Sequence, residues 1–322
     1  MAVGTSTGLT GEPIVTPETV TSTGSGNTLL DAEFLRKLER LSVVAKRPFP
    51  GRMKGEKRSP RRGSSVEFAD FREYTTGDDL RYVDWKAYAR LERLFVKLFV
   101  EEEDLSIHLL VDASQSMDYA GSPGSGRVTK FTFARKLAAA LGYVGLIRYD
   151  RVGVAGFAQA LGRRVPVLRS RAAVPQLFSY LEGLRPGGKT DFTHALQNYA
   201  QRAQTPGVCV IVSDFFDPNW EKGVRALLSR RFQIVLLQVF DREEVEPNLT
   251  GDLRLVDAET GESREISVTP QLLLRYNEAL NGFCGRLSEI ASRYQMDYIR
   301  TTTDAPLEDL LLKTFRNNGL LR

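Results

Sequence analysis

The sequence has few of the residues on which zinc enzymes and small cross-linked domains depend. Its 322 residues include two cysteines, Cys209 and Cys284, and two histidines. Two cysteines in apolar or helical stretches cannot build a disulfide framework or a zinc site, so we expect both in the core. The scarcity of histidine excludes most zinc hydrolases and Ser-His catalysts. Any metal site must therefore use oxygen ligands.

Long apolar runs are also missing. No stretch approaches the ~18 consecutive apolar residues of a membrane span. The first Lys or Arg is Arg36, and no apolar segment typical of a secretory signal precedes it. We therefore expect a cytoplasmic protein without a transmembrane span. An apolar fraction of 42% is enough for a folded core, and the length suits one large α/β domain or two smaller ones.

Positive charge is concentrated in one short stretch. Residues 46–62 contain eight basic residues and one acid, Glu56, whereas the whole chain has 44 basic and 40 acidic residues. Charge so confined, with Phe49 as the single aromatic residue, does not predict a nucleic-acid surface. We interpret the stretch as a solvated linker. The alternative is peripheral contact with an anionic membrane surface, or with an acidic partner.

Composition divides the chain into four regions. Residues 1–28 are rich in Gly, Ser, Thr and Pro and predict a disordered tail. Residues 29–63 comprise a helix at 29–46, with an apolar face, and the basic linker. Residues 64–104 form a short, polar-aromatic, β-rich segment, and residues 105–322 form the main domain. The apolar face of the predicted helix consists of Leu30, Phe34, Leu38 and Leu41.

Strands and helices alternate along the main domain. Strands are predicted at 105–112, 208–214, 232–240 and 296–300, with an adjacent pair at 152–158 and 164–168 and a hairpin at 252–268. Helices are predicted at 128–149, 172–184, 192–204, 220–230, 270–294 and 307–315. This alternation predicts a doubly wound α/β fold, with a mostly parallel sheet covered by helices on both faces. Ligands of such sheets bind at the carboxyl ends of the strands.

Oxygen-bearing side chains cluster at these predicted strand ends. Asp112, Ser114 and Ser116 follow the first apolar strand, Thr190 lies in a glycine turn before a helix, and Asp214 ends another strand. Because the three segments fall on one edge of the sheet, their side chains can converge. Two carboxylates and three hydroxyls suit a hard divalent cation such as Mg²⁺, with one position left for a carboxylate of another molecule. The alternative is that these residues only cap free backbone N–H groups.

This set of residues, in this chain order, resembles the metal-ion-dependent adhesion site (MIDAS) of von Willebrand factor A domains. The resemblance implies a Rossmann-like fold and a bound Mg²⁺, or Mn²⁺ or Ca²⁺. It also implies that Ser114 and Ser116 bind the ion directly, and Thr190 directly when a ligand is present, while Asp112 and Asp214 hold coordinating waters. One departure is that Phe215 replaces the glycine that usually follows the last Asp.

A second motif lies upstream of the main domain. Residues 72–90 follow the pattern R-x-Y-x-x-G-D-D-x-R-x-(I/V)-D-W-x-x-x-A-R. This pattern resembles the signature of the bacterial domain-of-unknown-function family 58, and the resemblance covers about residues 60–320. It implies partnership with a MoxR-type AAA+ ATPase in chaperone-like systems. The signature residues are Arg72, Gly77, Asp78, Asp79, Arg81, Asp84, Trp85 and Arg90.

The charges of this signature predict a set of ion pairs. Three arginines beside three aspartates can form bidentate Arg–carboxylate contacts, and Gly77 can supply a turn. Our interpretation is a structural clamp between this segment and the main domain, with a partner-docking surface as the alternative. The three arginines are Arg72, Arg81 and Arg90, and the three aspartates are Asp78, Asp79 and Asp84.

Three classes of function compete. Our hypothesis is a non-enzymatic, metal-dependent protein-interaction module whose ion captures an acidic residue of a partner, because hydroxyls without a poised base suit a clamp. The alternatives are a metal-assisted hydrolase with Asp214 or His194 as base, and a structural scaffold with a vestigial site. His108 is expected in the core. The glycine-rich stretch at 121–126 lacks the Lys and Ser/Thr of a phosphate loop, so nucleotide binding there is not expected.

Overall fold

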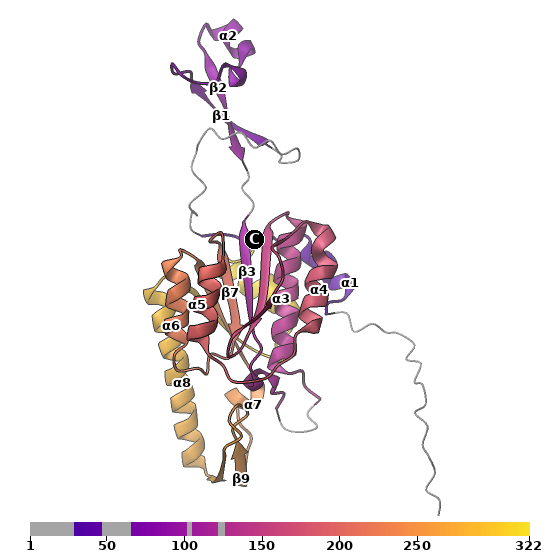
Figure 1. The fold of residues 1–322 in the computed structure, drawn as a ribbon, viewed down its shortest axis with the longest axis vertical. Helices are drawn as coiled ribbons and strands as arrows, with labels where there is room; N and C mark the ends of the chain where they lie inside the picture. Colours follow the sequence, from indigo (N-terminus) through magenta and orange to yellow (C-terminus); the bar gives the residue numbers. More distant parts are fainter. Residues whose placement is uncertain (1–28, 47–65, 102–104, 122–125) are drawn as a thin grey trace, which may run out of the picture.

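The computed structural model describes residues 29–46, 66–101, 105–121 and 126–322. Its centre is a seven-stranded sheet in the order β11-β8-β7-β3-β4-β5, with β6 paired to β4 (Figure 1). β3, β4, β7, β8 and β11 run parallel, whereas β5 and β6 pair antiparallel with β4. The strands are β3 (Ser106–Asp112), β4 (Arg151–Phe157), β5 (Leu161–Arg164), β6 (Leu168–Arg169), β7 (Val208–Ser213), β8 (Gln233–Phe240) and β11 (Asp297–Thr302).

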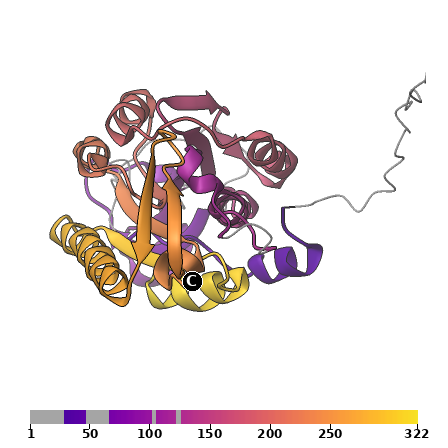
Figure 2. The same cartoon turned by 90° about the horizontal axis from the view of Figure 1, so that it is seen from below.

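Helices cover both faces of this sheet. On one face lie α3 (Lys130–Ile147) and α4 (Val174–Gly183), and on the other lie α5 (Phe192–Arg202), α6 (Trp220–Ser229) and α8 (Pro270–Arg293) (Figures 1 and 2). Alternate residues of each strand feed the two apolar cores: Val210 of β7 packs in the core under α3, whereas Cys209 and Ile211 pack under α5 and α6. The predicted mixed α/β fold with a mostly parallel sheet is confirmed. Cys209 and Cys284 are both buried and free, as expected.

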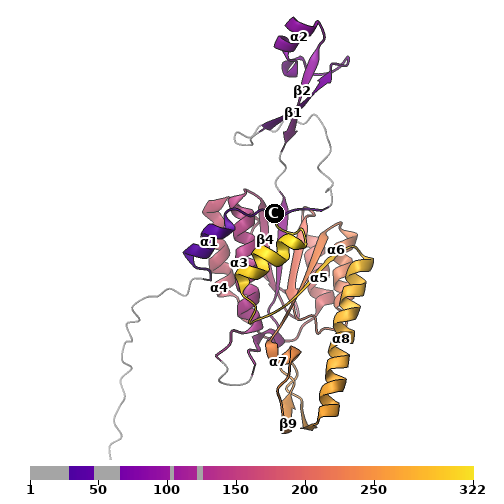
Figure 3. The same ribbon diagram turned by 180° about the vertical axis from the view of Figure 1, so that it is seen from behind.

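Two terminal predictions need correction. The predicted helix at 29–46 is shorter: α1 spans Ala32–Leu38. The chain leaves the helix because Val43 forms a β-bridge with Leu321, which joins the start of the described chain to its end (Figure 3). The predicted helix at 307–315 is divided into α9 (Leu307–Asp309), a π-helical turn (Leu310–Thr314) and α10 (Phe315–Asn317). The predicted tail at 1–28 and most of the basic linker lie outside the described residues.

The signature segment forms a small unit of its own. Antiparallel strands β1 (Val66–Glu73) and β2 (Phe95–Glu101) flank a 3-10 turn (Leu80–Tyr82) and α2 (Trp85–Leu91). Gly77 has a φ of +112°, a conformation that favours glycine, so the predicted turn is present.

The predicted ion pairs of this segment form in part. Arg72 Nη2 lies 2.8 Å from Asp78 Oδ1, and Arg81 pairs with Asp79 two residues before it. Asp84 has a different role, because its carboxylate caps α2 by accepting from Lys86 and Ala87 N–H groups. Arg90 makes no ion pair within the part of the chain that the structure describes. Both pairs therefore connect residues inside the segment.

The sequence predicted no transmembrane span, and the helices in the described part of the chain can be compared with that prediction. None of these helices combines the length and the apolar character needed to cross a bilayer.

The contact between α5 and α6 depends on a glycine, which gives a first testable prediction. A Cβ on Gly223 of α6 would lie 2.3 Å from the Phe192 carbonyl oxygen of α5. We expect Gly223→Ala to lower the free energy of unfolding by about 1–3 kcal/mol, the usual cost of overpacking. The matched control is Gly285→Ala on the exposed side of α8, where a Cβ meets nothing within 4 Å. Chemical denaturation should show no loss for the control, since alanine is the better helix former. Equal losses in both variants would contradict the packing argument.

Candidate metal and acid-binding site

The sheet brings two predicted aspartates to the same edge. β3 and β7 are adjacent and parallel, with Val111 opposite Val212. Asp112 is the last residue of β3 and Asp214 directly follows β7, so both lie at neighbouring strand ends. Both carboxylates are almost completely buried. The loop after Asp112 turns at once into a 3-10 helix (Gln115–Asp118). The three predicted residues of this loop therefore lie next to the end of β7.

Hydrogen bonds connect four of the five predicted ligands into one cluster. Ser114 Oγ lies 3.1 Å from Ser116 Oγ, and the Ser116 hydroxyl donates to Asp214 Oδ2 at 3.0 Å. Asp112 Oδ1 accepts from the Ser114 N–H at 2.9 Å, and its Oδ2 accepts from the Ser213 hydroxyl at 2.6 Å. The predicted convergence of the first and third segments is therefore present.

Thr190, the fifth predicted ligand, is connected to the cluster only through the backbone of the turn that precedes it. The turn before it is tied to the Asp112 loop, because Gly187 N–H donates to the Ala113 carbonyl at 2.8 Å and Gln115 N–H to the Gly188 carbonyl at 2.9 Å. The Thr190 hydroxyl, however, donates to Glu259 Oε1 at 2.8 Å. The turn thus lies beside the cluster, while the Thr190 side chain is paired with a different segment.

The sequence did not predict the cation at this site. The side chain of Lys130, at the start of α3, is 0% exposed, and its Nζ lies 2.8 Å from Asp214 Oδ2 and 2.7 Å from Glu244 Oε1. Burial alone lowers the pKa of Lys130, but the charges of Asp214 and Glu244 outweigh it and raise the pKa above its ordinary value. Lys130 is therefore a permanently charged partner of Asp214.

The negative charge of the cluster exceeds this one cation. Burial raises the pKa of Asp112 to about 7, and the nearby charge of Asp214 adds to the effect. Burial also raises the pKa of Glu244, against the opposing effect of Lys130. Lys130 pairs with Asp214 and Glu244, whereas Asp112 is held by the Ser114 N–H and the Ser213 hydroxyl. The site therefore favours either a proton on Asp112 or a further positive charge.

The two serine hydroxyls are close enough together to be neighbouring ligands of one small cation. Neighbouring ligands of an ion with bonds of about 2.1 Å lie about 3 Å apart, and Ser114 Oγ lies 3.1 Å from Ser116 Oγ, which is also an ordinary hydrogen-bond distance. No group of three or more His, Cys, Asp or Glu side chains in the described ranges is arranged as a metal cluster. A cation here would therefore rely on the serine hydroxyls, and it would share Asp214 with Lys130.

Phe215 stands where the adhesion-site pattern usually has glycine, and its packing shows how the turn accommodates it. Its φ is +63°, in the left-handed region where glycine is favoured. The side chain is completely buried and stacks on Phe192 at a centroid distance of 5.4 Å, with Trp220 edge-on at 5.9 Å. Truncation of a buried Phe to Ala costs about 3–5 kcal/mol, which is more than a backbone strain of about 1–3 kcal/mol. The turn therefore keeps its shape without glycine.

The two histidines have different environments. His108 is buried in β3, where its Nδ1 lies 2.7 Å from the Tyr199 hydroxyl, so its predicted core position is confirmed. His194 is exposed in α5, and its backbone N–H donates to the capping Asp191 carboxylate.

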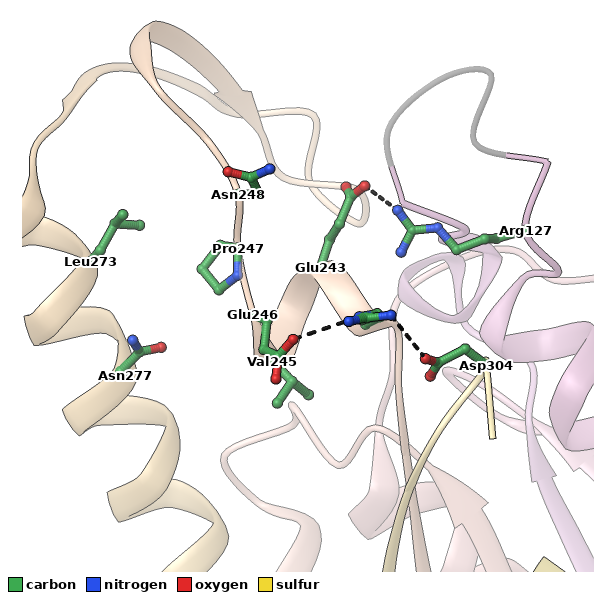
Figure 4. A pocket seen from close by; sticks show the side chains of 10 residues that line it. Arg127, Glu243, Val245, Glu246, Pro247, Asn248, Leu273, Asn277 and Asp304 are labelled. Carbon is green, nitrogen blue, oxygen red and sulfur yellow. Dashed lines mark hydrogen bonds and ion pairs between the residues drawn. The ribbon is translucent and has the colours of Figure 1, made fainter. Parts of the chain in front are cut away.

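The structure also has a cavity of about 790 Å³ (Figure 4). It lies between α7 (Arg242–Val245) and the first turns of α8, and none of the predicted ligands lines it. Arg127, at the cavity wall, pairs with Asp241 at 2.9 Å and with Glu243. The lining residues are Arg127, Arg242, Glu243, Val245, Glu246, Pro247, Asn248, Leu273, Asn277 and Asp304.

The raised pKa of Asp112 predicts a pH dependence in the absence of divalent metal. Between about pH 4 and pH 7 the folded chain holds a proton on Asp112 that the unfolded chain has lost. The free energy of unfolding should therefore fall as the pH rises through this range and level off above it. Urea titrations in EDTA should show this slope, and Asp112→Asn should reduce it while Glu244 continues to titrate. Identical slopes in both proteins would contradict the assignment.

Two residues of the site escaped sequence analysis for different reasons. Glu244 lies in α7, and the strand-end rule that placed Asp214 would point to Asp241, which directly follows β8. Lys130 begins a largely apolar helix, and only the fold shows that its side chain points to Asp214.

Comparison with known proteins assigns a family. A family model described as "Protein of unknown function DUF58" matches residues 70–281. The chain is 29% identical over 253 residues to the uncharacterized protein Rv1480 of Mycobacterium tuberculosis, covering 75% of this chain and 76% of the relative. It is 30% identical over 132 residues to the uncharacterized protein MAV169 of Mycobacterium avium, covering 41% of this chain and 71% of the relative.

Solved structures also show some similarity. One is the conserved hypothetical protein BatB from Bacteroides thetaiotaomicron, with 15% identity, a TM-score of 0.43 and coverage of 67% of this chain and 98% of that chain. Another is an aerotolerance-related membrane protein from Bacteroides fragilis, with 16% identity, a TM-score of 0.40 and coverage of 66% and 97%.

Proposed function

The chain belongs to the DUF58 family, whose function is unknown, and we propose that its site is a divalent-cation-dependent docking site for an acidic residue of a protein partner. The supporting observation is the cluster of Ser114, Ser116 and Asp214 oxygens at 3.0–3.1 Å, with Asp112 beside it. Hydroxyl ligands leave a bound ion more of its positive charge than carboxylates do. Such an ion can attract a carboxylate from another molecule.

The proposal includes the resemblance to a von Willebrand factor A domain. In it, Ser114 and Ser116 hold the ion, preferably Mg²⁺ and otherwise Mn²⁺ or Ca²⁺, while Asp112 and Asp214 act through water. The partner class implied by the family resemblance is a MoxR-type AAA+ ATPase. Both oxygens of Asp112 accept hydrogen bonds from Ser114 and Ser213 within the buried cluster. Such engaged carboxylates suit a binding role better than a hydrolytic one, so we propose that the chain is not an enzyme.

One observation favours a second candidate, a structural scaffold with a vestigial site. Lys130 already contacts Asp214 and is completely buried. An internal ammonium can neutralise part of the cluster without any metal. The two candidates differ in one respect: only the docking site requires a divalent ion to recruit a partner.

Capture of partners with and without metal tests the proposed function. The full chain, immobilised, is mixed with lysate of its own source in Mg²⁺ or in EDTA. We expect a partner that binds in Mg²⁺, is released by EDTA and is lost with Ser114→Ala/Ser116→Ala. The control is Ser229→Ala/Ser288→Ala, which changes two exposed helical serines. Capture that is equal in Mg²⁺ and EDTA, and equal for all variants, would contradict the docking role.

A further inference from the structure

A β-hairpin lies across the edge of the sheet that carries the site. β9 (Gly251–Val256) pairs antiparallel with β10 (Ser263–Val268), and Figure 2 shows the two strands extending across the end of the molecule. No residue of the hairpin or its tip is buried. The hairpin therefore adds nothing to the two apolar cores, and it can move without exposing them.

The tip of this hairpin holds a carboxylate against Thr190. Glu259 Oε1 accepts from the Thr190 hydroxyl at 2.8 Å, and Glu259 Oε2 accepts from the Thr190 N–H at 3.3 Å. Both oxygens of one carboxylate are thus bound by one residue. Glu259 is half-buried, whereas the other residues of the tip, 257–262, are exposed.

The tip is shaped to present this side chain. The Asp257 carboxylate accepts from the Glu259 N–H at 2.9 Å and from the Thr260 N–H at 2.7 Å, which fixes a tight turn. Thr190, on the other side, belongs to the turn that is hydrogen-bonded to the Asp112 loop. The contact therefore joins an exposed hairpin to a turn that is hydrogen-bonded to the loop carrying Ser114 and Ser116.

We infer that Thr190 is the carboxylate-binding position of the docking site and that Glu259 occupies it as an intramolecular ligand. This inference rests on the proposed function. The hairpin then competes with any partner, and a partner binds by presenting a carboxylate on a turn while the hairpin tip moves away. In either case the hydroxyl and the N–H of Thr190 donate to the acidic side chain, and the proposed ion supplies the positive charge that attracts it.

The first test measures the contact itself, in EDTA. Hydrogen exchange of the Thr190 amide is compared in the wild-type chain, in Glu259→Ala and in the control Glu262→Ala, which alters an exposed carboxylate of the same tip. We expect the Thr190 amide to exchange about tenfold faster in Glu259→Ala and at the wild-type rate in the control. A factor of about ten corresponds to the weakest hydrogen bonds made to charged groups. Unchanged exchange in Glu259→Ala would overturn the inference.

The second test measures competition. The probe is a cyclised peptide of residues 251–268, and the receptor is the full chain with residues 257–262 replaced by Asn-Gly. Val256 and Ser263 are opposite each other in the hairpin, so a two-residue turn can join them. Should this variant not fold, Glu259→Ala serves as receptor.

In Mg²⁺ we expect the peptide to bind the shortened chain at least about tenfold more tightly than the wild-type chain. In the wild-type chain the peptide must first displace Glu259, whose charged hydrogen bond to Thr190 opposes binding by about this factor. A peptide with Glu259→Gln should bind weakly. Equal affinity for both chains, or equal binding of both peptides, would overturn the inference while leaving Mg²⁺ binding intact. Absence of Mg²⁺ binding in every chain would instead overturn the proposed function and leave the exchange result unaffected.

Discussion

Replacing Lys130 with Met is expected to destabilise the chain more than any other change considered. The substitution keeps much of the apolar stem but leaves Asp214 and Glu244 without their shared ammonium partner. Removal of one member of a buried ion pair costs about 3–5 kcal/mol. For a domain of this size that corresponds to a fall in melting temperature of roughly 10 °C.

Thermal unfolding in EDTA checks this expectation. The control is Lys222→Met on the exposed side of α6, where a surface change should stay within about 0.5 kcal/mol. Mg²⁺ should then restore part of the stability of Lys130→Met, because a divalent ion can replace the missing charge. A loss equal to that of the control would show that Lys130 is no counter-ion. A large loss that Mg²⁺ leaves unchanged would favour the vestigial scaffold.

Mg²⁺ is expected to stabilise the wild-type chain, and the effect should vanish without the two serines. A ligand at 100 times its dissociation constant stabilises the folded state by about 2.7 kcal/mol, which is roughly 5–10 °C in melting temperature. Ser114→Ala/Ser116→Ala removes the two hydroxyls that would hold the ion. Because the buried Asp214 carboxylate also loses the Ser116 donor, we expect the double variant to be less stable in EDTA by about 1–3 kcal/mol. The Mg²⁺ shift is therefore measured from each protein's own melting temperature in EDTA.

A Mg²⁺ titration followed by thermal unfolding measures this response. The control Ser229→Ala/Ser288→Ala should shift as the wild-type chain does. If Ser114→Ala/Ser116→Ala retained the full shift, the ion would bind elsewhere on the chain, and the serines would not be its ligands.

Sequence periodicity located most of the fold to within one or two residues. The strand predicted at 208–214 is Val208–Ser213, and the helix predicted at 270–294 is Pro270–Arg293. These elements have apolar patterns long enough to fix their type and extent. The first helix ended early because Val43 pairs with Leu321, a contact between distant parts of the chain that no local pattern encodes.

The candidate site was predictable where it follows strand ends. Asp112 and Asp214 were placed on one edge by the rule for parallel sheets, and the structure brings them together with Ser114 and Ser116. The contacts of Lys130 and Glu259 were not predictable. Each depends on how a helix or a hairpin packs over that edge, which the sequence pattern of the element does not specify.

The most direct measurement of the central claim is the position of a divalent ion in the protein. Crystals of the wild-type chain grown with Mn²⁺ can be measured for anomalous scattering from the metal. We predict one peak at bonding distance from the Ser114 and Ser116 hydroxyls, with Asp112 and Asp214 around it. Lys130 should either move away from Asp214 or share Asp214 with the ion. A map without a peak at these serines at saturating Mn²⁺, with Lys130 still in contact with Asp214, would contradict the account.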